Sequence, residues 1–300
     1  MKIFAHAKIN LTLGVLGKRP DGYHEVEMVM QSIALHDTLQ IRKQAAGISL
    51  TVAGADLPGD GNNLVFRAAS LLQAKTGNKS GVHIHLAKRI PVAAGLGGGS
   101  ADAAAALRAL NMFWRLGLSP AELMDLGAAL GSDVPFCLLG GTAIARGRGE
   151  LLTPLSARPK FGLVLVKPAA RVSTARVYGA YGAFSGSFQK PRPDCAAMAA
   201  ALAQGDPDAV ARCLANDLEP VTAAMHPEVR RIKEKLLAAG ATGALMSGSG
   251  PTVFGLTGDV DSARLVAARY RRAPGELVFV SQMIHPSGFR PDLREPVERG

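Results

Sequence analysis

A glycine-rich segment that runs straight into a helical pattern constrains this chain more than any other feature. Gly95 and three consecutive glycines precede Ser100, and Ala103, Leu107 and Leu110 then recur at helical spacing. Glycine permits positive φ and a close approach of the backbone to a ligand. The start of a helix offers unpaired N–H groups and the positive end of the dipole. We therefore favour a phosphate-binding loop over a flexible turn.

This loop differs from the two best-known nucleotide-binding patterns. A Walker A loop requires a lysine followed by a hydroxyl residue after its last glycine, and both are missing here. A dinucleotide fingerprint requires a glycine where this chain has Ser100. The loop therefore predicts phosphate binding of another type.

Asp133 is a second candidate, because apolar residues and a proline follow it in the segment Gly-Ser-Asp-Val-Pro-Phe at 131–136. A carboxylate that is fixed in place and partly desolvated is a candidate general base. An aspartate in such a segment is equally typical of a helix N-cap or a turn. The segment alone does not separate these interpretations.

Residues 2–13 alternate between two faces, which predicts a strand with one buried face. Lys8 and Asn10 lie on the more polar face. A lysine on such a strand is usually solvated. Lys8 therefore becomes a candidate only if the fold brings it near Asp133.

Two further segments each allow two interpretations. Tyr23 and His24 follow the turn sequence Arg-Pro-Asp-Gly at 19–22, and such a pair could hold a planar base by stacking and hydrogen bonding. Packing within a strand is the favoured interpretation when the pair is taken alone. The segment Ser-Gly-Ser-Gly-Pro-Thr at 247–252 is typical of a tight hairpin loop. It could also close over a site as a second backbone loop.

Composition restricts the class of protein. The net charge of +10 suits an anionic partner, but the basic residues are scattered, without the basic stripe typical of nucleic-acid binding. The three cysteines show no CxxC spacing, which indicates neither a disulfide framework nor a zinc site. We see neither a signal peptide nor an apolar run of membrane-spanning length. We expect a cytoplasmic protein with no nucleic-acid or membrane partner.

The remaining pattern predicts an α+β fold rather than a doubly wound sheet, since antiparallel strands come early and helices dominate later. A boundary near 157 would divide the chain into domains 1–157 and 158–285, and the Pro-rich, charged residues 286–300 are expected to form a loose tail. Strands are expected at 2–13, up to about 41, 48–52, 82–86, 141–146, 161–166, 243–246, 252–256 and 277–281, and helices at 63–76, after 100, from 120, and at 174–184, 195–203, 207–214, 227–239 and 260–272.

Three of these motifs occur in one order: 8–10, then 91–103, then 247–252. This combination resembles the GHMP kinase superfamily, which includes galactokinase, homoserine kinase, mevalonate kinase and phosphomevalonate kinase. The segment Arg-Pro-Asp-Gly-Tyr-His-Glu at 19–25 resembles one branch in particular. That branch phosphorylates a cytidine diphosphate-linked methylerythritol. The resemblance covers roughly residues 1–285.

The resemblance implies a two-domain fold with the active site in the cleft between the domains. The N-terminal domain would bind ATP and contain a mixed, largely antiparallel sheet with helices, and the C-terminal domain would be α+β. The implied reaction is phosphorylation of the 2-hydroxyl of the substrate with ATP and Mg²⁺, a step of the non-mevalonate route to isoprenoid precursors. The expected assembly is a monomer or a homodimer.

The resemblance also implies roles for individual residues. Asp133 would be the catalytic base, and Lys8 would lie beside it and favour its charged form. The implied substrate-binding residues are Asn10, Tyr23, His24, Thr174 and Tyr178. The implied ATP-binding residues are Asn63, Pro91, Ala94, Gly95, Leu96, Gly97, Gly98, Gly99, Ser100 and Ala101. No metal ligand is implied by number.

Three alternatives stay open at this point. Another branch of the superfamily, of the homoserine or mevalonate kinase type, is disfavoured by the turn at 19–22 and by Tyr23 and His24. A non-catalytic nucleotide sensor on the same fold would need the loop but neither Lys8 nor Asp133. A nucleic-acid-binding protein would need a basic stripe and strongly salt-dependent binding.

Overall fold

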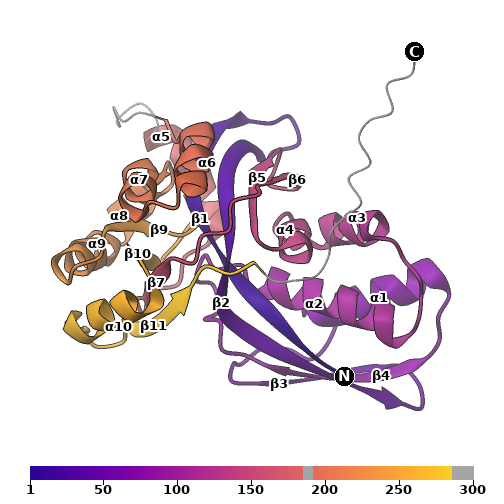
Figure 1. Cartoon of the computed structure of the whole chain (residues 1–300). Coiled ribbons are helices and arrows are strands. Elements are labelled where there is room, and N and C mark those ends of the chain that lie inside the picture. The colour runs from indigo at the N-terminus through magenta and orange to yellow at the C-terminus, as the bar shows by residue number, and fades with distance from the viewer. Residues whose placement is uncertain (185–191, 286–300) are drawn as a thin grey trace.

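The computed structural model describes residues 1–184 and 192–285. The tail expected at 286–300 lies outside this part of the chain. The described residues form two sheets with helices around them, as an α+β fold requires (Figure 1). The prediction of the fold class is therefore confirmed.

The larger sheet is built on two long antiparallel strands, β1 (Lys2–Lys18) and β2 (His24–Gln44). In the described chain this sheet has seven strands, with the order β3-β4-β2-β1-β8 and with β5 and β6 attached through β2. Two of its pairings are parallel, β3 with β4 and β1 with β8, and the rest are antiparallel. The bounds of its other strands are β3 (Ile48–Ala53), β4 (Gly81–Ala87), β5 (Thr142–Arg146), β6 (Leu151–Pro154) and β8 (Ala215–Asn216).

Strand β1 corrects the expectation of one buried face. The apolar face is buried from Ala5 to Leu13 as expected, but Lys8, Asn10 and Thr12 on the other face are also buried. The backbone N–H of Lys8 donates to the carbonyl of Leu96, and the hydroxyl of Thr12 contacts the thiol of Cys195 at 3.2 Å. Segments distant in sequence therefore cover the second face, which the alternation of residues 2–13 could not reveal.

The smaller sheet has four antiparallel strands in the described residues, in the order β11-β7-β10-β9. Every residue of β7, β9 and β10 is buried, because helices cover this sheet. The strand bounds are β7 (Gly162–Lys167), β9 (Gly243–Met246), β10 (Val253–Thr257) and β11 (Leu277–Gln282).

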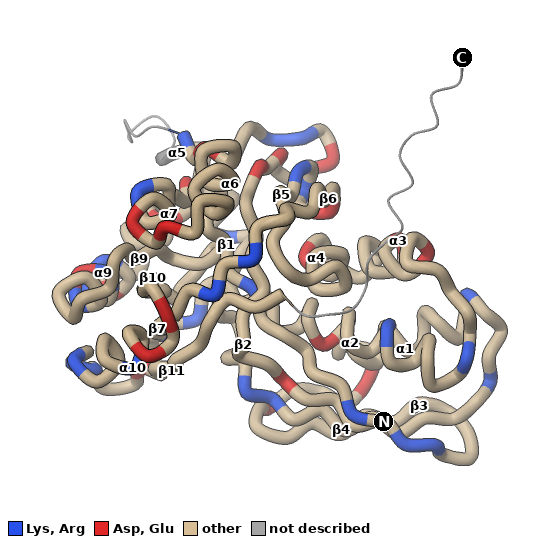
Figure 2. The backbone as a smooth tube through the Cα atoms, viewed as in Figure 1, with Lys and Arg blue, Asp and Glu red and all other residues tan. Residues whose placement is uncertain are grey.

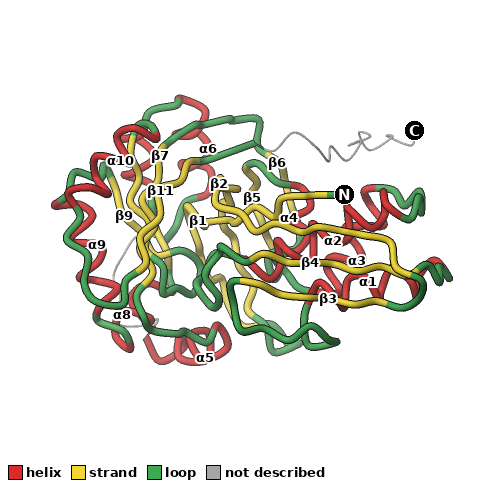
Figure 3. Tube along the Cα trace, turned by 90° about the horizontal axis from the view of Figure 1, so that it is seen from below, coloured by secondary structure: helices red, strands yellow, loops and turns green. Residues whose placement is uncertain are grey.

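The helices form two groups around the sheets. Figures 1 and 3 show α1, α2 and α3 packed together beside β3 and β4, whereas α9 and α10 flank the smaller sheet. Ser119 and Glu122 form a capping box at the start of α3, the helix expected from 120. The helices are α1 (Leu64–Thr76), α2 (Gly98–Phe113), α3 (Pro120–Leu130), α4 (Val134–Leu139), α5 (Thr174–Phe184), α6 (Cys195–Gln204), α7 (Pro207–Cys213), α8 (Glu219–Met225), α9 (Glu228–Ala238) and α10 (Val260–Arg269).

Most of the expected elements are present, and four short ones were missed: α4, α8, β6 and β8. Each has seven residues or fewer, too short for a clear period in the sequence. Basic and acidic residues are interspersed along the chain (Figure 2). Among the described helices, none combines the length and the apolarity needed to cross a bilayer.

Candidate active site

A cavity of about 1050 Å³ brings together segments from both halves of the chain. Its walls come from β1, the start of β2, the loop before α2, the turn before α4, helix α5 and the loop between β9 and β10. Of the site residues predicted from the sequence, all but Ala101 line it. Ala101 is instead buried in the apolar core, and its N–H donates to the carbonyl of Gly97 within the helix.

The start of α2 forms one wall of the cavity. Gly97 is the N-cap, with φ of 67°, and no side chain caps the helix. The N–H groups of Gly98, Gly99 and Ser100 belong to the first turn, where intrahelical acceptors are lacking. No acidic residue lies in this first turn. These N–H groups and the positive end of the helix dipole are thus available to an anion.

The loop before α2 is held by the loop at 247–252. The hydroxyl of Ser247 donates to the carbonyl of Gly95 at 2.9 Å, and the N–H of Thr252 donates to the carbonyl of Ala94 at 3.4 Å. A Cβ on Gly95 would lie 2.2 Å from the carbonyl oxygen of Ser247. Both interpretations of 247–252 are therefore correct, since it joins the antiparallel strands β9 and β10 and also forms part of the cavity wall.

Lys8 lies beside Asp133 in this cavity. Its Nζ is 3.3 Å from Oδ2 of Asp133 and donates to Oδ1 of Asn10 at 2.8 Å. The amide nitrogen of Asn10 in turn contacts the sulfur of Met28 at 3.0 Å. Lys8 is buried, and its stem packs against Gly97, where an added Cβ would lie 2.9 Å from Cγ of the lysine. The lysine therefore connects the phosphate-binding loop to the carboxylate.

The structure also distinguishes between the two interpretations of Asp133. The residue does occupy the N-cap position of α4, but its side chain makes no capping hydrogen bond. Its carboxylate instead pairs with Lys8, and the side chain keeps 30% of its exposure. Asp133 can therefore accept a proton from a molecule in the cavity.

Aromatic rings line a further part of the cavity wall. The ring centroids of His24 and Tyr178 lie 5.1 Å apart, and Tyr23 is exposed at the rim. Burial, and then the charge of Asp133, raise the pKa of the Tyr178 phenol. Burial, and then the charge of Lys18, lower the pKa of His24. The rings of His24 and Tyr178 therefore present neutral, planar groups to the cavity.

Thr174 connects helix α5, which carries Tyr178, to the loop at 247–252. It begins α5, and its hydroxyl contacts that of Ser249 at 2.8 Å. Tyr178 lies one helical turn further along the same helix. The contact between the two hydroxyls thus fixes α5, and with it Tyr178, against the loop.

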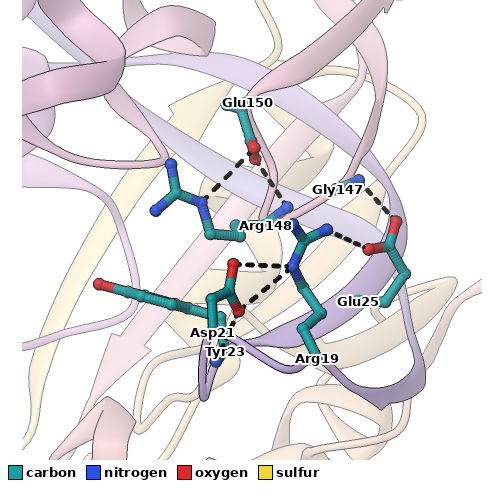
Figure 4. Close-up of polar contacts among 7 residues, drawn as sticks. All are labelled: Arg19, Asp21, Tyr23, Glu25, Gly147, Arg148 and Glu150. Carbon is teal, nitrogen blue, oxygen red and sulfur yellow. Dashed lines mark hydrogen bonds and ion pairs between the residues drawn. The ribbon is translucent and has the colours of Figure 1, made fainter.

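A network of charges holds the turn that carries Tyr23 (Figure 4). Arg19 binds Asp21 and Glu25, and Glu25 accepts the N–H of Gly147 at 3.1 Å. Arg148 lies over the ring of Tyr23, with 5.0 Å between Cζ and the ring centroid. The segment 19–25 is therefore fixed to the turn between β5 and β6.

Asn63 lines the cavity, but its amide is engaged elsewhere. Its oxygen caps α1 by accepting the N–H of Val65 at 3.0 Å, and its nitrogen donates to the carbonyl of Pro58 at 2.9 Å. The residue thus shapes the cavity wall by fixing the segment before α1.

Sequence patterns did not identify a buried charge cluster that lies beside the glycine-rich loop. Nζ of Lys88 donates to Asp37 at 2.5 Å and to Asp102 at 2.6 Å, and all three residues are buried. Burial raises the pKa of Asp102 to about 8, against the opposing effect of the Lys88 charge. An aspartate in a helix otherwise rich in alanine was the available signal.

Comparison with family models gives two matches. Residues 63–141 match the N-terminal domain of the GHMP kinases, and residues 198–276 match the C-terminal domain of the same kinases. The first match includes the phosphate-binding loop and Asp133, and the second includes the loop at 247–252.

Two relatives are named 4-diphosphocytidyl-2-C-methyl-D-erythritol kinase. The protein of Pelotomaculum thermopropionicum is 62% identical over 94% of this chain and 97% of its own length. That of Moorella thermoacetica is 50% identical over 91% and 96%.

This chain is also similar to solved structures of kinases. A crystal structure of 4-(cytidine 5'-diphospho)-2C-methyl-D-erythritol kinase has a TM-score of 0.81 and 37% identity, covering 95% of this chain and all of its own. Homoserine kinase from Cytophaga hutchinsonii shares the fold, with a TM-score of 0.74 at 21% identity over 95% of each chain.

Proposed function

This chain belongs to the GHMP kinase family, and we propose that it transfers the γ-phosphoryl group of ATP to the 2-hydroxyl of 4-diphosphocytidyl-2-C-methyl-D-erythritol. This reaction is a step of the non-mevalonate route to isoprenoid precursors. The observation that carries the proposal is the arrangement within one cavity. The start of α2, the Lys8–Asp133 pair, and the rings of His24 and Tyr178 all line this cavity.

The transfer itself depends on alignment and on stabilisation of charge. The N–H groups at the start of α2 bind the triphosphate and keep its γ-phosphoryl group beside Lys8. Asp133 accepts the proton of the attacking hydroxyl as the new P–O bond forms and the bond to ADP breaks. The ammonium of Lys8 stabilises charge on the transferring group and orients Asp133.

The cytidine end of the substrate binds among the aromatic residues. A cytosine ring stacks on Tyr23 or Tyr178 and hydrogen-bonds to the neutral His24 imidazole. Asn10, held by Lys8, faces the middle of the same cavity and positions the erythritol. A nucleoside-linked alcohol therefore suits this cavity better than homoserine or mevalonate, which have no planar group for these rings.

Mg²⁺ fits the oxygen groups beside the loop. The described residues contain no cluster of three metal-ligating side chains, and Mg²⁺ commonly uses one or two protein oxygens together with substrate phosphates. An added Cβ on Gly131 would lie 4.0 Å from the Ser100 hydroxyl, so this hydroxyl lies beside the turn that carries Asp133. Ser100 is the residue that would hold the ion, together with phosphate oxygens of ATP. When bound, it neutralises phosphate charge.

The proposal also covers the oligomeric state, the cellular location and the domain division of the enzyme. The proposed assembly is a monomer or a homodimer. We place the enzyme in the cytoplasm, where its three free cysteines would stay reduced. The division into an ATP-binding domain at 1–157 and a second domain at 158–285 also remains a proposal.

Release of ADP tests the function directly. Purified protein is supplied with Mg²⁺, ATP and the cytidine diphosphate-linked methylerythritol, beside an Asp133→Ala variant. We expect ADP release that depends on the substrate and falls by about 10²–10⁴-fold in the variant. If the wild-type protein binds ATP without turning over this substrate, the proposed substrate is wrong, and homoserine and mevalonate are tested next.

A further inference from the structure

We propose that Lys88 and Asp102 are positioning residues for ATP, which act by clamping the two ends of the phosphate-binding loop to strand β2. The inference rests on the proposed function only in taking ATP as the ligand of this loop. Neither residue is needed for the chemistry described above.

The geometry joins three segments at one ammonium group. Lys88 is the first residue after β4, in the short stretch that leads into the loop. Asp37 lies on β2, and Asp102 lies on α2, which follows the loop. Nζ of Lys88 donates to both carboxylates, at 2.5 and 2.6 Å. The ammonium group is thus the point where the start of the loop, its end and the central sheet meet.

Asp37 strengthens the attachment at the start of the loop. Its second oxygen accepts the backbone N–H groups of Arg89 and Ile90, at 2.5 and 2.8 Å. These residues immediately precede the loop that begins at Pro91. Asp37 is fully buried, so solvent cannot replace these bonds.

The cluster also lies next to the N-terminus of α2, where an anion would bind. A Cβ on Gly98 would lie 3.3 Å from Nζ of Lys88 and 2.9 Å from a methyl group of Ile90. Lys88 and Asp102 both line the cavity, and Oδ1 of Asp102 is buried without a hydrogen-bond partner. A shift of either residue therefore moves the N–H groups that would face the phosphates.

A buried ion pair is a poor source of stability, because desolvation opposes the attraction between the charges. Here it fixes a geometry that a glycine-rich loop cannot fix by itself, since glycine leaves the backbone conformationally free. We therefore expect loss of the clamp to affect ATP more than the second substrate, which lies among residues of β1, β2 and α5.

The test compares four single variants, and the double variant Lys88→Met with Asp102→Ala, in two measurements. Binding of a non-hydrolysable ATP analogue is measured by calorimetry, and KM is measured separately for ATP and for the methylerythritol substrate. Lys88→Met and Asp102→Ala remove the clamp. Asp102→Asn keeps an acceptor oxygen for Lys88, and Lys43→Met removes an exposed charge on β2 that is outside the cluster.

We expect Lys88→Met and Asp102→Ala each to weaken analogue binding by about tenfold or more, the scale of coupling within one polar network. The KM of the second substrate should stay within about twofold, and Asp102→Asn should recover most of the loss. The double variant should bind little worse than the worse single variant, because both changes break one unit. Lys43→Met should bind like the wild type.

Other results overturn the inference. The inference is wrong if a folded Lys88→Met or Asp102→Ala protein binds the analogue normally. It is also wrong if both KM values rise equally, or if Asp102→Asn binds the analogue as weakly as Asp102→Ala. If Lys88→Met does not fold, Asp102→Ala decides, because it leaves the pair of Lys88 and Asp37 in place. A wild-type protein that binds the analogue without transferring phosphate contradicts the proposed function alone, and one that does not bind it contradicts both.

Discussion

The ammonium of Lys8 and the carboxylate of Asp133 lie 3.3 Å apart, although one residue belongs to the first strand and the other precedes α4. The lysine is buried, whereas the aspartate keeps part of its side chain open to the cavity. The pair therefore has one fixed partner and one accessible partner, an arrangement that suits a base which must reach a substrate.

Loss of the Lys8 charge should affect the chemical step. We expect Lys8→Met to lower kcat by about 10²–10³-fold, because a preorganised donor beside the transferring phosphoryl group is lost. Steady-state ADP release measures this effect. Lys2→Met, at the exposed start of the same strand, is the control. A normal kcat in Lys8→Met would contradict the assigned role.

Gly95 should not tolerate even alanine. A Cβ there would lie 2.2 Å from the carbonyl oxygen of Ser247, and the residue has φ of 76°. The two loops must therefore separate, and we expect KM for ATP to rise about tenfold or more from this strain. Gly17→Ala is the matched control, since nothing lies within 4 Å of its added Cβ.

The ring of Tyr178 should matter more than its hydroxyl. We expect Tyr178→Leu to raise KM for the methylerythritol substrate by about tenfold through lost stacking, with KM for ATP unchanged. Tyr178→Phe keeps the ring and should remain near wild type. An equal loss in both variants would instead assign the effect to the hydroxyl.

Acidification should weaken the use of the cytidine substrate through His24. Burial and the charge of Lys18 lower the pKa of His24 below its ordinary value of 6.5, so the ring stays neutral at pH 6.5 and gains its proton only at lower pH. A protonated ring has no acceptor nitrogen. We expect kcat/KM for this substrate to fall only below pH 6.5.

A second variant checks the cause of this shift. Lys18→Met removes a charge that opposes protonation of His24, so it should raise the pKa of His24. The fall of kcat/KM on the acid side of the pH profile, its acid limb, should then move to higher pH. The limb should disappear in His24→Gln. An acid limb that stays in place in both variants would belong to another group.

Local sequence patterns were enough to predict the long helices and strands and the glycine-rich loop before α2. The alternation at 2–13 predicted a strand, and the glycines before Ala103 predicted the start of a helix, because both signals depend only on neighbouring residues. The resemblance to a known family supplied the pairing of Lys8 with Asp133, which no local pattern contains.

What the sequence could not show depends on contacts between distant segments. The polar face of β1 is buried by other parts of the chain, and the cluster of Asp37, Lys88 and Asp102 exists only once β2, the end of β4 and α2 meet. Strand β8 has two residues, so only its partner defines it.

That short strand determines how the protein can be divided. Ala215 and Asn216 come from the second half of the sequence, yet they pair with Thr12 and Leu13 in the first sheet. The amide of Asn216 also donates to the carbonyls of Met246 and Gly248. A fragment that ends near 157 would leave an edge of β1 open to aggregation, so the two halves are not exchangeable modules, and heating should melt them in one cooperative transition.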